Sequence, residues 1–343
     1  MTYTESMGTG NTSESGTVNA GLGLHTVYAK DLSGLTDNDK QRLLACVNYG
    51  QKQQLPAGSA VAVNVHMEQL GGHDFHELWF SASPVHSGKS GNITYRANDE
   101  VMFGYWQPPT HEIDLKSESV NAYNELRKFL SSSSHPNLLR VWNYMSSIND
   151  EYDGIERYQR FCLGRYDALL QDGEFEETGL PAASALGSDS GGLTMYFIST
   201  RHPGVAVENP RQVSAYHYPE QYGPRSPSFS RAMMIGGADS ANLFISGTAS
   251  IKGHETCYAG DVRGQLQETV MNINTLIKQS GCGPNDISAL SLLKVYMRNA
   301  SDYTLVHNML SDIAPDVPTM YLRADICRVD LLLEIEGLYL SSN

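Results

Sequence analysis

The chain has few cysteines, and none of them forms a paired motif. Its 343 residues include five cysteines, at positions 46, 162, 257, 282 and 327. No two are spaced as CxxC and their number is odd, so a disulfide framework is not indicated. Unpaired thiols are typical of proteins in a reducing compartment, and we therefore expect a cytoplasmic location.

Basic residues are also scarce. Lys and Arg together number 24 against 38 Asp and Glu, which gives a formal net charge of -14. A general nucleic-acid binder needs a basic footprint, so this class of protein is not expected. A small anionic substrate stays compatible with the composition, because one or two local arginines suffice to bind it.

Long apolar runs are missing as well. No stretch approaches the length of a membrane-spanning helix, so no membrane partner is expected. Residues 1–23 are rich in Gly, Ser and Thr and lack the apolar segment of a signal peptide. We expect these residues to form a flexible tail.

Several well-known site motifs are absent. The glycines do not occur in a GxxxxGK(S/T) or GxGxxG context, and no GxSxG motif surrounds Ser246 or Ser250. His73 and His76 are three residues apart in a strand-like stretch, which places their rings on opposite faces, and no HExxH motif accompanies them. The sequence therefore predicts no nucleotide site, no metal site and no hydrolase serine.

Hydrophobic periodicity divides the chain into strands and helices. Alternation at period 2 and short apolar runs predict strands at residues 60–66, 77–80, 138–148, 193–198, 242–246, 290–297 and 331–335. Apolar residues at helical spacing predict helices at residues 37–48, 117–131, 155–170, 262–277 and 303–310. This mixture indicates the α+β class.

The middle and C-terminal parts of the chain can be overlaid. Residues 142–145 correspond to 294–297, and residues 193–197 correspond to 331–335, which places Tyr196 at the position of Glu334. This predicts a duplicated β-α-β-α-β unit with a third, decayed copy at the N-terminus. We expect units at residues 24–115, 116–211 and 212–343 in a pseudo-trimeric arrangement. One main cleft between units would then carry the carboxylate.

Glu334 is the most informative polar residue, because it lies between Leu333 and Ile335 in an apolar strand. Burying a charged carboxylate is costly. Such a group is solvated, paired with a cation, or kept protonated to deliver a proton. Glu336 shares its face in a regular strand and would raise its pKa if both were buried, but we expect Glu336 to be exposed at the strand end.

Several motifs carry a resemblance to known families. They are the runs RYQRFCLGR (157–165), NPRQ (209–212), YPEQYGPRSPSFSR (218–231), FISGTAS (244–250) and ADICRVDLLLEIE (324–336). The C-terminal unit, about residues 228–337, resembles the RidA/YjgF-like family, whose members are trimers of small α+β units with ligand clefts between neighbours. The whole chain from about residue 24 is more specifically similar to the chorismatases.

The resemblance implies that the chain removes the enolpyruvyl side chain of chorismate as pyruvate, without a metal or organic cofactor. Some chorismatases add water and release a dihydroxylated cyclohexadiene carboxylate, whereas others release 3-hydroxybenzoate or a mixture with the 4-isomer. Cleavage of an enol ether requires protonation of its methylene carbon, a task for a carboxyl with a raised pKa. Glu334 is the expected acid. The resemblance also makes Cys327 and Gly247 residues that direct the reaction to 3-hydroxybenzoate.

The alternatives for these two residues are structural. Cys327 precedes Glu334 by seven residues, roughly 23 Å in one unbroken strand, so the two share a site only if the chain reverses near Asp330. A hairpin there would make them cross-strand neighbours; otherwise Cys327 is a small buried core residue. Gly247 either leaves room beside the substrate ring or supplies a turn with positive φ.

Chorismate carries two carboxylates, and the planar fork of arginine suits them. The expected substrate-binding residues are Arg165, Arg160, Tyr216, Tyr222, Arg225 and Ser230. Arg165 lies among apolar neighbours and is the first choice. Arg160, five residues earlier on the predicted helix, does not share its face well, and each of these arginines could instead be ordinary surface charge.

Two rival functions fit parts of the sequence. An imine or enamine deaminase of the RidA kind would need an arginine opposite the carboxylate, for which Arg323 is the candidate. A RidA-like module that binds a carboxylated metabolite without turnover is the other. The middle segment, residues 157–231, favours the chorismatase, because the smaller family lacks it. The chain is expected to be a monomer or a small homo-oligomer.

Overall fold

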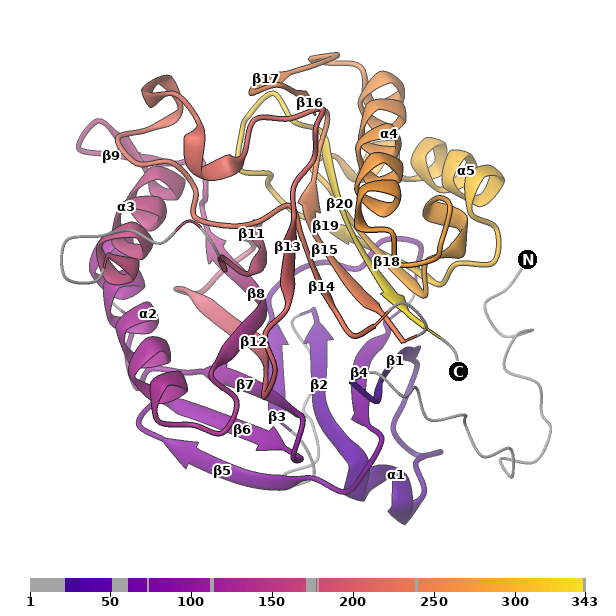
Figure 1. Ribbon diagram of the computed structural model, residues 1–343. Helices are drawn as coiled ribbons and strands as arrows, with labels where there is room; N and C mark the ends of the chain where they lie inside the picture. The colour runs from indigo at the N-terminus through magenta and orange to yellow at the C-terminus, as the bar shows by residue number, and fades with distance from the viewer. Residues whose placement is uncertain are drawn as a thin grey trace.

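A computed structural model describes residues 22–50, 61–72, 74–111, 114–170, 177, 179–237 and 240–341. The predicted tail lies outside these residues except for Leu22 and Gly23, and His73 lies outside them as well. The described residues form three large β-sheets and two two-stranded hairpins, and two of the large sheets carry long helices on their outer faces (Figure 1). The predicted α+β class is confirmed.

The N-terminal sheet has the strand order β1-β4-β2-β3. Its strands are β1 (Leu24–Ala29), β2 (Leu43–Tyr49), β3 (Val61–Val65) and β4 (His76–Ser81). The helix predicted at residues 37–48 is wrong beyond Arg42, since α1 (Asp37–Arg42) ends there and β2 follows directly. Every residue of β2 is buried, because a strand in the middle of a sheet with both faces covered takes a continuous apolar run.

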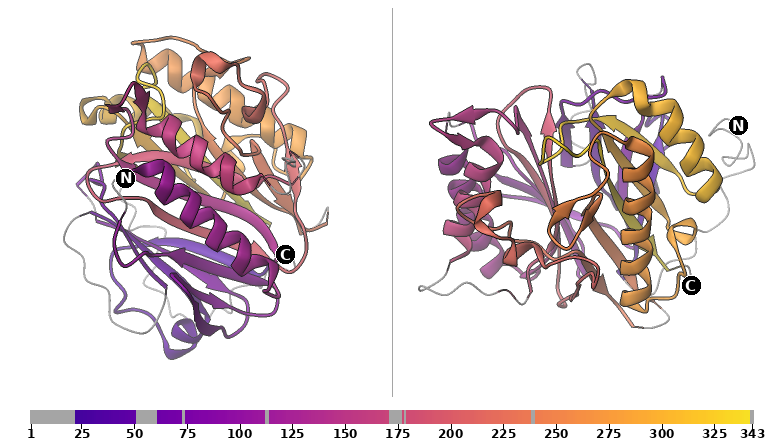
Figure 2. Two further views of the ribbon diagram at one scale, coloured as in Figure 1. Left: turned by 90° about the vertical axis from the view of Figure 1, so that its left-hand side faces the viewer. Right: turned by 90° about the horizontal axis from the view of Figure 1, so that it is seen from above.

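The middle sheet has the order β11-β8-β12-β7-β6-β5. Its strands are β5 (His86–Ser90), β6 (Ile93–Ala97), β7 (Val101–Trp106), β8 (Asn137–Ser146), β11 (Ala182–Ser188) and β12 (Thr194–Thr200). The helices α2 (Leu115–Ser131) and α3 (Arg157–Leu169) lie side by side on its outer face (Figure 2). Asp114 caps α2 by accepting from the backbone of Lys116 and Ser117. The apolar faces of both helices pack against the sheet in one core.

The C-terminal sheet has the order β13-β14-β15-β20-β18-β19. Its strands are β13 (Val205–Val207), β14 (Ala232–Ile235), β15 (Asn242–Thr248), β18 (Leu292–Met297), β19 (Thr319–Arg323) and β20 (Leu333–Leu340). It is covered by α4 (Val262–Ser280) and α5 (Tyr303–Ile313), whose apolar faces form a second core with the sheet. Gly281, in the left-handed region at φ 65°, ends α4.

Short elements complete the connections. They are the hairpins β9 (Glu151–Tyr152) with β10 (Ile155–Glu156) and β16 (Ile251–Lys252) with β17 (Glu255–Thr256), and the 3-10 turns η1 (Ala215–His217), η2 (Glu220–Tyr222), η3 (Ile287–Ala289) and η4 (Ala300–Asp302). Both hairpins and the turns η1 and η2 lie in segments that also contain lining residues of the cavity described below.

The three sheets share one topology. In each, a central strand pairs parallel with one neighbour and antiparallel with another: β2 with β3 and β4, β8 with β11 and β12, and β18 with β19 and β20. The predicted repetition is therefore present in all three units. The strands β5, β6 and β7, from the range assigned to the first unit, join the middle sheet, and β13 joins the C-terminal sheet.

The strand registers correct the sequence overlay. Glu334 lies opposite Tyr296, whereas Tyr196 lies opposite Trp142, and Trp142 corresponds to Lys294, which faces Glu336. The predicted equivalence of Tyr196 with Glu334 is thus wrong by two residues, and Tyr196 corresponds to Glu336. A slip of two keeps every side chain on its own face, so the hydrophobic pattern alone could not reveal it.

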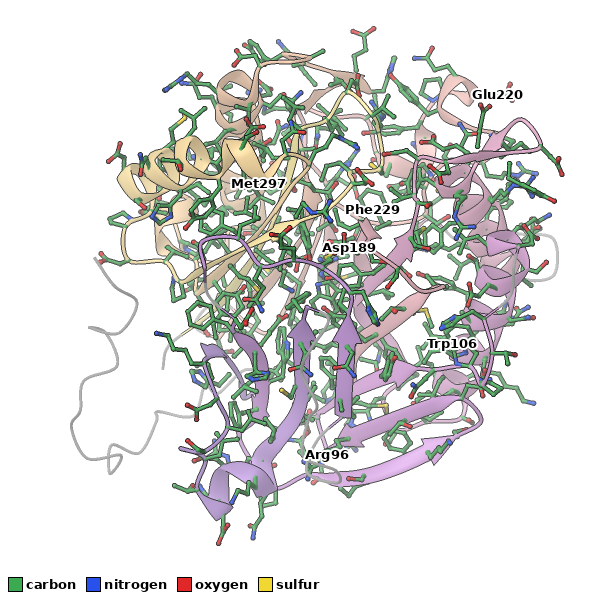
Figure 3. The ribbon with its side chains drawn as sticks, turned by 180° about the vertical axis from the view of Figure 1, so that it is seen from behind. Arg96, Trp106, Asp189, Glu220, Phe229 and Met297 are labelled. Carbon is green, nitrogen blue, oxygen red and sulfur yellow. The ribbon has the colours of Figure 1, made fainter. Side chains whose placement is uncertain are left out.

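The inner faces of the three sheets meet in a common core. Its centre is polar: the hydroxyls of Tyr144 and Tyr296 are 2.7 Å apart, and those of Tyr49 and Tyr196 are 3.0 Å apart. A second junction lies at Asp189 (Figure 3), whose backbone N–H donates to the carbonyl of His66 at 2.7 Å and whose carboxylate pairs with Arg323. Residues from all three units therefore contact one another directly.

Candidate active site

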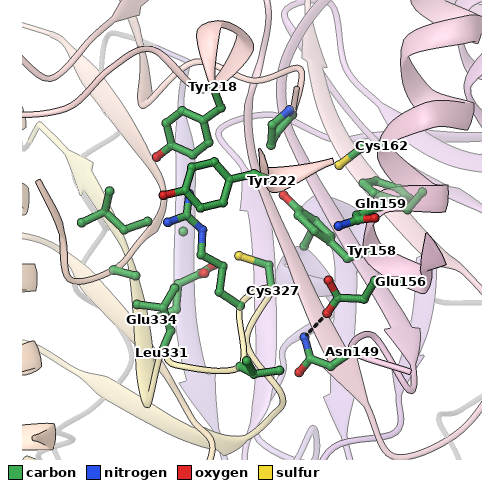
Figure 4. Close-up of a pocket in the computed structure, with 18 of the residues that line it drawn as sticks. Asn149, Glu156, Tyr158, Gln159, Cys162, Tyr218, Tyr222, Cys327, Leu331 and Glu334 are labelled. Carbon is green, nitrogen blue, oxygen red and sulfur yellow. Dashed lines mark hydrogen bonds between the residues drawn. The ribbon is translucent and has the colours of Figure 1, made fainter. Parts of the chain in front are cut away.

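A cavity of about 530 Å³ lies between the middle and C-terminal units (Figure 4). This volume is in the range of small-molecule sites. Its lining comes from α3 and the loops around it, from β11 and β15, from the turn at η2, and from the segment that joins β19 to β20. Every lining residue lies between positions 149 and 334, so the N-terminal sheet contributes none of them.

Glu334 lines this cavity from β20 and is only 5% exposed. Burial raises the pKa of its carboxyl to about 8, and the negative charge of Glu336 acts in the same direction. At neutral pH the carboxyl therefore carries a proton. A protonated carboxyl in a cavity is equipped to act as a general acid.

Glu336 was expected at the surface, and this expectation is wrong. It is 6% exposed, and its carboxylate accepts hydrogen bonds from Arg140 at 2.6 Å, Ser184 at 2.7 Å and Trp142 at 2.9 Å. Lys294 pairs with it at 2.9 Å. Burial alone would raise its pKa, but Lys294 and Arg140 outweigh burial and lower the pKa to about 2. The two neighbouring carboxyls thus differ in charge, one neutral and one ionised.

Gly247 lies in β15 and also lines the cavity. Its φ is not in the left-handed region, so a turn with positive φ is not the reason for glycine here. A Cβ atom at this position would lie 1.8 Å from Oε1 of Glu334, inside van der Waals contact. Its backbone N–H donates to Ser184 Oγ at 3.1 Å. The missing side chain therefore provides the space that the Glu334 carboxyl occupies.

Cys327 reaches the cavity from the loop after β19. The chain does reverse where the sequence required it, with Leu331 N–H donating to the carbonyl of Arg328 at 3.1 Å. The alternative in which a hairpin makes Cys327 and Glu334 cross-strand neighbours is not realised, because β19 and β20 both pair with β18 and not with each other. Burial and the adjacent Glu334 raise the pKa of the Cys327 thiol well above its ordinary value. The group is therefore a neutral thiol at physiological pH.

Three arginines in the lining keep buried nitrogens without a partner among the described residues. They are Arg165 (Nε and Nη2), Arg231 (Nε) and Arg328 (Nη2). Arg165 is 2% exposed and its guanidinium lies 5.0 Å from the ring of Tyr123. Buried donors without partners are costly, so such a set indicates an anionic ligand.

Aromatic rings fix two of these guanidiniums. Arg328 stacks on Tyr222 at 3.8 Å and donates to the carbonyl of His254 at 2.8 Å. Arg231 donates to the hydroxyl of Tyr218 at 2.7 Å. Figure 4 shows Tyr218 and Tyr222 together on the side of the cavity nearer to Glu334. The cationic groups are thus oriented before any ligand binds.

The opposite wall is polar and less basic. Glu156, Tyr158, Gln159 and Cys162 form it (Figure 4), and Asn149 donates to Glu156 Oε1 at 2.9 Å. Burial raises the pKa of Glu156. This wall can accept and donate hydrogen bonds to hydroxyl groups of a ligand. Within the part of the chain that the structure describes, no cluster of three or more His, Cys, Asp or Glu residues could hold a metal.

Comparison with known proteins identifies the family. The family model described as chorismatase FkbO/Hyg5-like, N-terminal, matches residues 77–199. A 3-hydroxybenzoate synthase from Streptomyces hygroscopicus is 35% identical over 314 residues, which are 87% of this chain and 91% of the relative. The chain belongs to the chorismatase family.

Two further relatives agree with this assignment. A chorismatase from Streptomyces rapamycinicus is 34% identical over 284 residues, covering 80% of this chain and 84% of the relative. A solved chorismatase structure superimposes with a TM-score of 0.85 at 31% identity, covering 93% of this chain and 99% of that one. The likeness therefore extends over nearly the whole fold and over both sides of the cavity.

Four of the residues expected to bind substrate do not line the chorismatase cavity. Arg160 pairs with Asp114 at 3.2 Å, because a step of five residues along α3 turns it away from Arg165. Tyr216 packs edge-on against His217, and Arg225 is exposed and stacks on Tyr166 at 4.4 Å. Ser230 is buried and donates to the carbonyl of Ala232. Arg165 and Tyr222 do line the cavity.

The sequence reasoning missed several groups around the carboxyl pair. Arg231 and Arg328 lie within the motifs 218–231 and 324–336 but were not among the residues expected to bind substrate, and Ser184 carried no recognisable signal. Arg140 and Lys294 gave the same signal as Glu334, since each is a charge inside an apolar strand. That signal would have found them, because a buried charge requires a partner of opposite sign.

Replacing Glu336 with glutamine is expected to shift the pH dependence of catalysis. The substitution removes the neighbouring negative charge that helps to raise the pKa of Glu334. The plateau of kcat/KM, which we expect in the wild type up to about pH 8, should then end at a lower pH. A pH profile of pyruvate release checks this. An unchanged alkaline limit in a folded variant would contradict the coupling.

No helix in the described parts of the chain is long and apolar enough to cross a membrane.

Proposed function

We propose that this chorismatase converts chorismate into 3-hydroxybenzoate and pyruvate. The observation that carries the proposal is the protonated Glu334 carboxyl in a cavity where three arginines have unpartnered nitrogens. Chorismate has two carboxylates that could bind the arginines and an enol ether that the acid could protonate. A relative of 35% identity that is named 3-hydroxybenzoate synthase supports this product.

The chemical step begins at Glu334. Its proton is transferred to the methylene carbon of the enolpyruvyl group, which leaves a carboxylate on Glu334 and an oxocarbenium ion on the substrate. The charge of Glu336, held by Lys294 and Arg140, keeps the proton on Glu334 until the substrate is bound, and it favours the positive charge that then develops on the substrate. The bond between the ether oxygen and ring carbon C3 then breaks and releases pyruvate, while the oxygen of the C4 hydroxyl moves to C3. The proton that C4 loses can return to the Glu334 carboxylate. Pyruvate and hydroxybenzoate together contain all atoms of chorismate, so the ring loses one proton as it becomes aromatic and no water is consumed.

The arginines bind the two carboxylates. We assign one carboxylate to Arg231 and Arg328, whose ring partners Tyr218 and Tyr222 lie on the Glu334 side of the cavity in Figure 4. The other carboxylate is assigned to Arg165, which comes from α3 on the facing wall. This arrangement would hold the enol ether near the acid by fixing both ends of the substrate.

Product choice is assigned to Cys327 and Gly247. Both line the cavity beside Glu334, and neither brings a charged or hydroxyl group to it. A neutral thiol and a bare backbone offer no strong acceptor that would orient a water molecule for attack on the ring. Rearrangement is then favoured over hydrolysis, which would give the dihydroxycyclohexadiene carboxylate instead.

The test is to incubate the purified protein with chorismate alone and separate the products by chromatography with mass detection. Pyruvate with 3-hydroxybenzoate in equal amounts is the expected result. Pyruvate with a dihydrodiol acid would retain the acid role of Glu334 and overturn the product assignment. Absence of pyruvate would overturn the function.

Replacing Arg165 with methionine is expected to raise KM for chorismate by roughly 10- to 100-fold, because one charge-assisted contact to a carboxylate is lost. Arg127→Met is the matched control, since Arg127 lies on the neighbouring helix α2 and donates to the carbonyl of Ala168, away from the cavity. Steady-state kinetics at fixed pH measures both variants. Equal KM values for the two would contradict the assignment of Arg165.

Arg323, the candidate arginine for a deaminase of the RidA kind, lies outside the cavity. It is engaged by Glu68 at 3.1 Å and by Asp189. One chain supplies every group of the proposed site, so we propose that a monomer is sufficient for activity, whether or not the chain also forms a small homo-oligomer.

A further inference from the structure

A buried charge cluster lies behind the cavity, at the centre of the three sheets. The ammonium of Lys294 is 2.8 Å from Glu77 Oε2 and 2.9 Å from Glu336 Oε1. All three residues are buried, Lys294 at 0%, Glu77 at 1% and Glu336 at 6% exposure. Two acids therefore share one lysine in a region without solvent.

The cluster joins units that are far apart in the sequence. Glu77 comes from β4, Lys294 from β18 and Glu336 from β20. Glu77 also accepts from the hydroxyl of Tyr49 at 2.8 Å and from Trp79 Nε1 at 3.2 Å. The N-terminal sheet lines no part of the cavity, yet it provides one of the two acids that hold Lys294.

Buried ion pairs of this kind are seldom the most stable filling of a core. Hydrophobic residues of similar volume often serve stability as well or better. Lys294 also lies 5.2 Å from the ring of Tyr49 and 5.7 Å from that of Trp142, so aromatic packing was available at this place. A role beyond stability is therefore indicated, and the contact of Lys294 with Glu336 shows where that role would act.

We propose that Lys294, held by Glu77 of the N-terminal sheet, is a positioning residue that keeps the negative charge of the carboxyl pair on Glu336 and so keeps the proton on Glu334. This inference rests on the proposed role of Glu334 as the acid. Lys294 does not line the cavity and acts through Glu336.

Charged and titratable groups from several strands surround Glu334 and Glu336. Glu336 is contacted by Lys294 of β18, by Arg140 and Trp142 of β8, and by Ser184 of β11. The neutral phenols around the cluster are Tyr49, Tyr144, Tyr196 and Tyr296, whose pKa values burial raises. On the side of Glu334 the charges that act on it are Glu336, Arg140 and Arg231.

Removing Lys294 leaves Arg140 as the cation that holds Glu336. Two interacting acids titrate as a pair. When the pair holds one proton, this proton lies mostly on the acid whose ionised form is less stabilised by nearby cations. Without Lys294 the proton moves toward Glu336, and Glu334 is fully protonated only at a pH low enough for both groups to be neutral. The active form is then lost at a lower pH than in the wild type.

The test uses the double variant Glu77→Gln/Lys294→Met, which removes one charge of each sign and keeps similar side-chain volumes. The pH profile of kcat/KM for pyruvate release should fall with a midpoint about one pH unit or more below that of the wild type. Glu77→Gln alone should shift the midpoint in the same direction but by less, because Lys294 still pairs with Glu336 but has lost the acid that holds it. Glu255→Gln, at an exposed position, is the control and should keep the wild-type midpoint. If circular dichroism shows that the double variant is unfolded, Glu77→Gln/Lys294→Gln takes its place with the same expected shift.

A folded double variant with the wild-type midpoint and only a lower melting temperature would overturn the inference and leave Lys294 a structural role. Failure of the proposed function is recognised separately, since a wild type that releases no pyruvate has no profile to shift. In that case infrared spectra decide the matter without turnover. The band of protonated carboxyls at neutral pH should lose intensity on Glu334→Gln in the wild type, and should lose less in the double variant, where Glu334 carries less of the proton. An equal loss in both would overturn the inference.

Discussion

Replacing Glu334 with glutamine is expected to lower the rate of pyruvate release by roughly 100- to 10,000-fold, the range that a general acid contributes. Glutamine keeps the shape and polarity of the side chain but has no proton of suitable acidity to transfer to carbon. The fold should stay intact, because the carboxyl is neutral in the wild type at physiological pH. A pyruvate assay measures the loss.

The same variant should change stability in a defined pH window. The folded-state pKa of Glu334, about 8, is above the ordinary value of 4.5. The contribution of the carboxyl to stability is therefore fully present below the unfolded pKa and is lost as the pH rises through the folded pKa. Glutamine does not titrate, so its melting temperature relative to wild type should increase between pH 4.5 and about 8.

The control for both measurements is Glu255→Gln, at an exposed position of the β17 hairpin. It should leave the rate and the pH dependence of the melting temperature unchanged. A folded Glu334→Gln variant with more than a tenth of wild-type activity would rule out Glu334 as the acid.

Replacing Gly247 with valine is expected to reduce activity by roughly 100-fold or more, since a displacement of about 1 Å in a reacting group can have an effect of this size. The new Cβ would lie 1.8 Å from Oε1 of Glu334 and 2.7 Å from its carboxyl carbon. The carboxyl must rotate away, because it is the mobile end of the side chain. The backbone of Gly247 is that of an ordinary strand, so the fold should tolerate valine.

Gly337→Ala is the matched control for Gly247→Val. Gly337 lies in β20 three residues after Glu334, and a Cβ there would meet Cδ1 of Leu290 at 2.7 Å rather than the carboxyl. Its melting temperature should fall while its activity stays near the wild-type value. Wild-type activity in Gly247→Val would show that the carboxyl does not need the space beside Gly247.

The sequence was most informative where periodicity and a single unusual residue coincided. The helical face that runs from Val262 to Ile277 packs as predicted, because a spacing of three and four residues leaves no other face for the core. Glu334 in an apolar strand was recognised as costly, and the structure indeed gives it a raised pKa. Both inferences needed only local information.

Other features depend on distant residues and could not be read locally. The exposure of Glu336 was misjudged because its partners are distant in the sequence. Arg140 lies 196 residues away, and Lys294 lies on the neighbouring strand β18. Helix 37–48 was overextended because Leu43 begins a buried strand whose apolar run also fits a helix. Arg160 and Arg165 could be separated only by the direction in which α3 packs.

The three-sheet arrangement has a consequence for how such a site could arise. In an assembly of three identical chains, any substitution appears at all three interfaces, so the acid, its ionised neighbour and its cations would have to fit every cleft at once. Here the position of Glu334 is occupied by Thr194 in the middle unit, and that of Glu336 by Tyr196. Linking the copies in one polypeptide frees each from the sequence of the others. One interface can then specialise in chemistry, while the N-terminal copy loses its long helices and retains the glutamate that its neighbours use.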